Sequence, residues 1–105
     1  MVEYDPYAYE MHEDPYPTYA ALRAEAPLYR NERLGFWALS RHADVLGAFR
    51  DPERFSNRYG VSLDRASSHP RAHAMMSFLV MDPPRHTRMR ALVSRGFTPR
   101  RIAEL

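Results

Sequence analysis

The fold is decided by residues 81–105, which read MDPPRHTRMRALVSRGFTPRRIAEL. Asp82 is a favourable N-cap, and Pro83 suits the first helical position, where a missing N–H costs nothing. A helix is therefore predicted from Pro83 to Arg95. Gly96 is expected to end it in the left-handed conformation, because glycine adopts that conformation without a Cβ penalty.

The apolar residues of this predicted helix lie on one arc. At roughly 100° per residue, Met89, Leu92 and Val93 share a face, and that face is expected to be buried. Arg88 and Arg95 point the opposite way and are expected in solvent. After the helix, a Thr-Pro pair predicts the cap and start of another one.

His86 and Arg90 lie one turn apart at the edge of the apolar arc. No acid occurs between Pro83 and Arg101, so nothing on the helix itself can neutralise them. Half-buried cations need a partner, and the sequence therefore predicts an anion that comes from outside the helix. The alternative, which spacing alone favours, is a hydrogen-bonded core histidine beside an arginine whose head reaches solvent.

The first half of the chain predicts two helices around a hairpin. Residues 1–13 are expected to form an extended arm. Asp14 and Pro15 cap a helix that stops at Pro27, and two short strands follow at 28–30 and 36–39. Ser40 is expected to cap the second helix, and the predicted packing residues of this region are Trp37, Val45, Leu46, Phe49 and Phe55.

Two stretches resemble one known family. Residues 82–102, DPPRHTRMRALVSRGFTPRRI, closely resemble the pattern DPPxHTRxRxLVxxxFTxRR of soluble bacterial haem-thiolate monooxygenases, the cytochrome P-450 family. Residues 36–57, FWALSRHADVLGAFRDPERFSN, resemble the strand, helix and turn that come earlier in the same family. The resemblance implies that His86 and Arg90 bind the haem propionates. Arg85 departs from the family, which commonly carries an acid there.

The resemblance implies an α+β, mainly helical fold that corresponds to the N-terminal part of one catalytic domain. Its expected parts are an arm (1–13), helix A with a small hairpin and helix B (14–56), the B–C loop (57–81), and helix C with the start of the next helix (82–105). The loop forms part of the substrate pocket in the family. Its candidate lining residues are Val61, Leu63, Met75, Met76, Phe78, Leu79 and Val80.

Composition limits the function classes. Residues 1–53 carry ten acids and five arginines, whereas residues 54–105 carry three acids and ten arginines, so the second half favours an anionic partner. No apolar run approaches a membrane span, and a cytoplasmic location is expected. His69 and His73 are spaced as i and i+4, but Pro70 disfavours a helix through them, and no metal site is predicted.

The chain contains no cysteine, although a haem-thiolate enzyme needs one on its iron. The chain is therefore expected to be a segment of a larger monooxygenase and inactive alone, with haem b bound only in the intact protein. The expected partners are a small organic substrate, the rest of the monooxygenase chain and a ferredoxin-type electron donor. In the family such a donor docks on a basic surface, here formed by Arg88, Arg95, Arg100 and Arg101.

Two other functions compete with this interpretation. A basic helix can bind nucleic-acid phosphates, but Phe97 is the only aromatic residue among the six arginines of this region, and no base-reading motif is present. Loss of tight DNA binding as salt rises would identify that function. The other competing function is a non-catalytic remnant that acts only in interactions.

Overall fold

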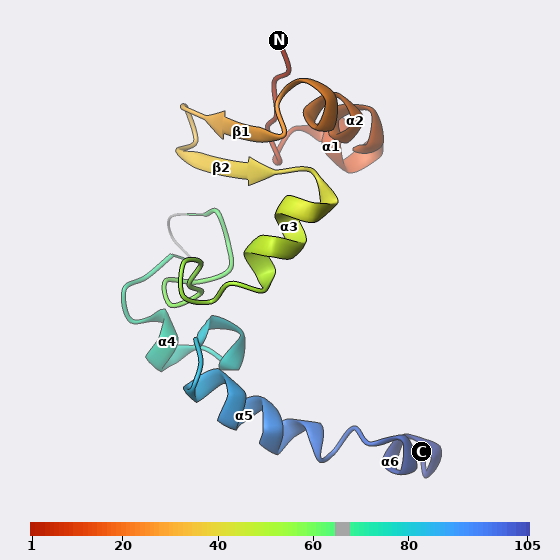
Figure 1. Cartoon of the computed structure of the whole chain (residues 1–105), viewed down its shortest axis with the longest axis vertical. Coiled ribbons are helices and arrows are strands. Elements are labelled where there is room, and N and C mark those ends of the chain that lie inside the picture. Colours follow the sequence, from red (N-terminus) through yellow and green to blue (C-terminus); the bar gives the residue numbers. More distant parts are fainter. Residues whose placement is uncertain (65–67) are drawn as a thin grey trace. The chain divides into compact units, whose positions relative to one another are not determined.

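The computed structural model describes residues 1–64 and 68–105. They form two compact units, Met1–Arg50 and Asp51–Leu105. The elements, shown in Figure 1, are α1 (Tyr9–Glu13), α2 (Tyr16–Glu25), β1 (Leu28–Asn31), β2 (Phe36–Leu39), α3 (His42–Phe49), α4 (Ala72–Met75), the 3-10 turn η1 (Phe78–Val80), α5 (Arg85–Ser94) and α6 (Pro99–Ala103). The α+β, mainly helical class is confirmed.

The predicted hairpin is present in the first unit. β1 and β2 pair antiparallel, with Leu28 opposite Leu39 and Asn31 opposite Phe36 (Figure 1). The turn closes because Gly35 has a φ of 70°, which glycine adopts without steric cost. Asn31 is buried, and its side-chain oxygen accepts a hydrogen bond from the Leu34 N–H at 2.8 Å.

The N-terminal residues pack on this hairpin through Tyr4. Its ring makes edge contacts with Tyr19, Tyr29 and Phe36, at centroid distances of 6.3, 6.0 and 5.9 Å. The Asn31 amide donates to the Tyr4 carbonyl at 2.9 Å, and the Tyr4 N–H donates to the Tyr29 hydroxyl at 3.2 Å. The hairpin is thus the surface that holds the arm.

Helix boundaries in the first unit differ from the prediction in two places. Residues 1–13 are not wholly extended, because Tyr9–Glu13 form α1, where the Tyr9 hydroxyl donates to the Glu13 carboxylate at 2.6 Å. Ser40 does not cap the next helix. Its hydroxyl donates to the Pro27 carbonyl at 3.4 Å, and α3 begins at His42. The Asp14 carboxylate does accept from the N–H of the first residue of α2.

The predicted packing residues around α3 are mostly exposed. Phe49 is 84% exposed and Trp37 60%, and Phe55 and Leu46 are also on the surface, whereas Val45 is half-buried. The physical reason is that the buried apolar residues of the first unit are only Leu22 and Phe36, so no described element of that unit covers this face. Trp37 instead lies beneath the guanidinium of Arg30, 5.2 Å from the ring centroid.

The core of the second unit is small and lies in the expected loop. Ala72, Val80 and Met81 are its buried apolar residues, and both α4 and α5 pack against η1. The 57–81 stretch therefore contains short helical turns that the sequence pattern did not predict. Residues 65–67 of that stretch lie outside the described residues.

The ends of α5 also differ from the prediction. The helix begins at Arg85, and the Asp82 side chain does not cap it, because its oxygens accept hydrogen bonds from Ser56 and Asn57 instead. Gly96 does not take a positive φ, and its N–H donates to the Val93 carbonyl at 2.9 Å. The Thr98 hydroxyl caps α6 as predicted, accepting from the Arg101 N–H at 3.3 Å.

Candidate functional site

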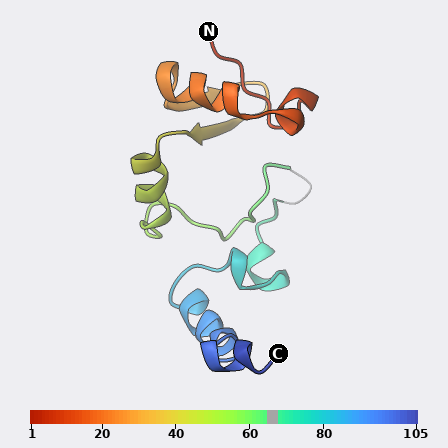
Figure 2. The same ribbon diagram turned by 90° about the vertical axis from the view of Figure 1, so that its right-hand side faces the viewer.

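The candidate site is the cationic face of α5, the blue helix that follows η1 in Figure 2. His86 and Arg90 both lie within its helical residues, so they are separated by about one turn. Arg90 is exposed, and among the described residues no carboxylate pairs with its guanidinium. Its hydrogen-bonding capacity is therefore free for an external anion.

His86 is more enclosed than Arg90. It is half-buried, and its ring lies 6.0 Å from that of Phe78 in η1. The backbone N–H of His86 donates to the backbone carbonyl of Asp82 at 3.0 Å. Within the part of the chain that the structure describes, its imidazole makes no hydrogen bond, and the Asp82 carboxylate is a charge that acts on it. The packing against Phe78 orients the ring.

The predicted buried arc of α5 is wrong for this chain. Met89, Leu92 and Val93 are 39%, 58% and 42% exposed, because η1 covers only part of the helix. Arg90 is consequently exposed rather than half-buried. Burial does not distinguish it from Arg88, and the two arginines differ only in direction, by about 200° around the helix axis.

The other predicted surface cations are exposed too. Arg88, Arg95 and Arg101 have no ion-pair partner among residues 1–64 and 68–105, whereas Arg100 pairs with Glu104 at 3.2 Å. Arg85 is used internally, since its guanidinium donates to the His73 carbonyl at 3.1 Å. The second unit thus presents cations that its own acids do not neutralise.

The residues predicted to line a substrate pocket occupy different environments. Val80 is fully buried in the core of the second unit, so its side chain is not accessible in this conformation. Phe78 is half-buried and contacts His86. The other five are exposed, namely Val61, Leu63, Met75, Met76 and Leu79. The structure therefore brings one predicted pocket residue to the cationic face of α5.

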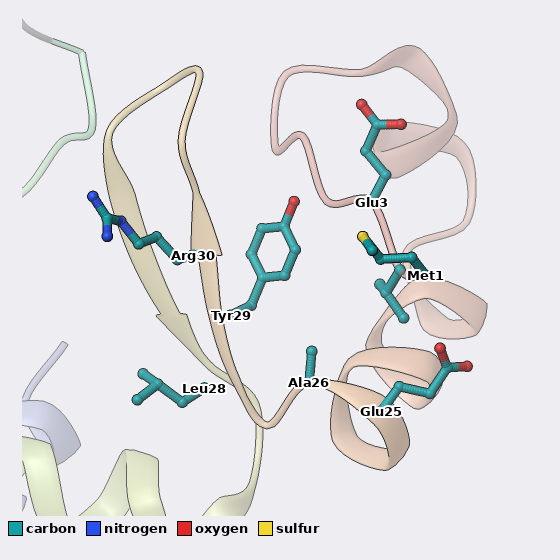
Figure 3. Close-up of a pocket in the computed structure, with 8 residues that line it drawn as sticks. Met1, Glu3, Glu25, Ala26, Leu28, Tyr29 and Arg30 are labelled. Carbon is teal, nitrogen blue, oxygen red and sulfur yellow. The ribbon is translucent and has the colours of Figure 1, made fainter.

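Sequence reasoning missed a hollow in each unit. One of about 520 Å³ in the first unit is lined by Glu3, Glu25 and Tyr29 among others, and Figure 3 shows Tyr29 of β1 pointing toward the segment that carries Glu3. Another of about 190 Å³ in the second unit is lined by Arg58, His73, Met81, Asp82 and Arg85. His73 Nδ1 is buried there and has no hydrogen-bond partner among the described residues, a feature that residue spacing does not reveal.

The carboxylate of Asp82 accepts hydrogen bonds just before the start of α5. Hydrogen bonds from the Ser56 hydroxyl and the Asn57 N–H lower its pKa, partial burial opposes that shift, and the charges of Arg58 and His86 lower it further. The sequence did not predict these hydrogen bonds, because the type and position of Asp82 indicated a helix cap.

The described residues show neither a metal-binding cluster nor a membrane-spanning helix. No group of three or more histidines, cysteines or acids there could hold a metal ion. His69 lies outside α4, as Pro70 predicted, and its Nδ1 accepts from the Arg71 N–H at 3.0 Å. No helix in the described part of the chain is both long and apolar enough to cross a membrane.

Comparison with known proteins finds related sequences and related structures, although no family model matches the chain. Cytochrome P450 123 of Mycobacterium tuberculosis is 64% identical over 101 residues, which cover 96% of this chain and 25% of the relative. The vitamin D(3) 25-hydroxylase of Pseudonocardia autotrophica is 43% identical over 99 residues, which cover 89% of this chain and 24% of the relative. A cytochrome P450 structure from Chondromyces apiculatus matches with a TM-score of 0.75 and 37% identity, covering 99% of this chain and 27% of that one. The chain spans about a quarter of the length of these relatives.

Proposed function

We propose that this chain, which belongs to the cytochrome P450 family by sequence and fold, is part of a haem-dependent monooxygenase and binds the haem propionates through His86 and Arg90. The observation that carries the proposal is the α5 face. It presents a histidine and an arginine one turn apart, with no carboxylate partner for the arginine among the described residues. A dicarboxylate such as haem supplies the missing charge.

The side chains present fit this cofactor. The Arg90 guanidinium can donate to a carboxylate in a bidentate manner, and the His86 ring, oriented by Phe78, can donate one more hydrogen bond. Bound haem supplies the oxygen-activating iron. The chain contributes orientation and charge neutralisation, and because it has no cysteine, the thiolate ligand must come from another part of the protein. We expect the 105 residues alone to be inactive, and haem b to be held only by the intact protein.

The substrate proposal concerns the 57–81 stretch. We propose that its exposed apolar residues, above all Met75, Met76 and Leu79, contact a small organic substrate in the intact protein. Their exposure supports this proposal, because such side chains are free to contact either a substrate or the rest of the chain. Val80 is the one pocket candidate whose burial assigns it to packing instead.

A cytoplasmic location remains a prediction from the sequence.

The unpaired cations support a proposal for the redox partner. An acidic ferredoxin-type donor would be attracted to Arg88, Arg95 and Arg101, and less to Arg100, whose charge Glu104 already offsets. Nucleic-acid binding is the weaker proposal for the same cations, because no described feature reads bases.

Charge reversal on this surface should slow electron transfer. In the intact protein we expect Arg88→Glu to lower the association rate of an acidic donor several-fold at low salt, because steering depends on long-range attraction. Stopped-flow reduction kinetics over a salt series measure this rate, and the effect of Arg88→Glu should shrink as salt rises. An association rate that is unchanged by Arg88→Glu at low salt would remove this surface from the docking site.

A further inference from the structure

The carboxylate of Asp82 connects the two ends of the 57–81 stretch. The Ser56 hydroxyl donates to Oδ2, and the Asn57 N–H donates to Oδ1 at 2.9 Å. These bonds join residues that are 26 and 25 positions apart in the sequence. By contrast, Asp51 also accepts from a guanidinium and an N–H, but both come from Arg54, three positions away. Of the two aspartates, only Asp82 closes a long loop.

The surroundings of Asp82 favour its ionised form. Arg58 and His86 contribute favourable charge, and Arg85 and His73 line the hollow beside it. Arg85 adds a second connection, because its guanidinium donates to the carbonyl of His73 within the stretch. Both connections lie at the N-terminal end of α5, where His86 begins the cationic face.

We propose that Asp82 is a positioning residue, whose carboxylate clasps Ser56 and Asn57 and thereby limits local opening of the described residues beside it, 57–64 and 72–81, and holds His86 in place at the start of α5. The clasp stands on its two hydrogen bonds alone, whereas its consequence for a ligand of His86 rests on the proposed function. Closing a long loop is costly in chain entropy, so removal of one strong acceptor at the closure point should have a disproportionate effect on opening.

Amide hydrogen exchange in the full-length protein tests the clasp. We expect Asp82→Ala to speed exchange in residues 57–64 and 72–81 by at least about tenfold, since both bonds to the carboxylate are lost. Ser56→Ala removes one bond, keeps the carboxylate, and should give a smaller increase in the same peptides. Asp51→Ala is the matched control, because its bonds are local, and it should leave these peptides unchanged.

Coupling between the two partners separates a clasp from general destabilisation. In the double variant Ser56→Ala with Asp82→Ala, the serine change should add almost nothing, because its partner is already absent. Additive increases in exchange, or equal effects of the Asp51 and Asp82 changes, would overturn the proposal. If Asp82→Ala does not fold, Ser56→Ala with the carboxylate intact still decides the outcome.

The pH profile gives an independent readout. Because the pKa of Asp82 is lowered from its ordinary value of 3.8, its contribution is fully present above that value and is lost as pH falls through the lowered pKa. Between pH 5 and 8 we therefore expect the exchange of these peptides, corrected for intrinsic rates, to stay constant. A step in exchange within this pH range would show that a group other than Asp82 controls it and would overturn the clasp. Haem content, measured on the same samples, tests the proposed function separately.

Discussion

Arg90→Ala is expected to weaken haem retention by the intact protein at least tenfold. A charge-assisted hydrogen bond contributes about 1.5–3 kcal/mol, and about 1.4 kcal/mol corresponds to a factor of ten in binding. No carboxylate of the described residues pairs with Arg90, so its removal should release no internal acid and leave the fold of α5 unchanged. Haem occupancy after purification and the haem dissociation rate measure the effect.

Two variants on the same helix are the controls. Arg88→Ala removes another exposed arginine, which points about 200° away, and it should leave haem content near wild type. His86→Ala should weaken retention less than Arg90→Ala does, because a neutral imidazole donates only an ordinary hydrogen bond. Equal loss of haem in the Arg88 and Arg90 variants would show that the helix face has been assigned wrongly.

The isolated 105-residue chain is expected to lack a cooperative unfolding transition. Among residues 1–64 and 68–105, the buried apolar residues number two in the first unit, Leu22 and Phe36, and three in the second, Ala72, Val80 and Met81. Many large side chains remain exposed, including Phe49 at 84% and Phe97 at 69%. A two-stranded sheet with so little cover is marginal in water.

Calorimetry measures this directly. The expected thermogram is broad, with an enthalpy far below the roughly 0.7 kcal/mol per residue of globular proteins. A sharp two-state transition near that enthalpy would show that the exposed apolar faces need no further cover. Phe49→Ser is a useful companion variant, because a side chain this exposed should alter the thermogram of the isolated chain little.

The sequence predicted the secondary-structure elements better than it predicted the contacts that those elements make. The hairpin and the Thr98 cap follow from short-range turn and capping chemistry, which neighbouring residues determine. Asp82 is a residue whose hydrogen bonds could not be predicted from its neighbours in the sequence. Its type and position suited a helix cap, but the long-range partners Ser56 and Asn57 compete for the same oxygens. Periodicity carries no information about such partners.

Burial was the property that the sequence predicted least well. Helical spacing placed Met89, Leu92 and Val93 on one face, but it could not say whether this chain covers that face, and η1 covers only part of it. The absence of nearby acids predicts an external anion for His86 and Arg90, and that assignment stays a prediction. The contact between His86 and Phe78 required the three-dimensional structure.

The most direct test of the propionate assignment is a chemical cycle on the intact protein. Wild-type and Arg90→Ala apoproteins are titrated with haem and with haem whose two propionates are methyl esters, and the four affinities are compared. If Arg90 contacts a propionate, esterification should weaken binding to the wild type by tenfold or more and weaken binding to Arg90→Ala much less. Equal losses in both proteins would show that Arg90 does not interact with the propionates, and the central claim would be wrong.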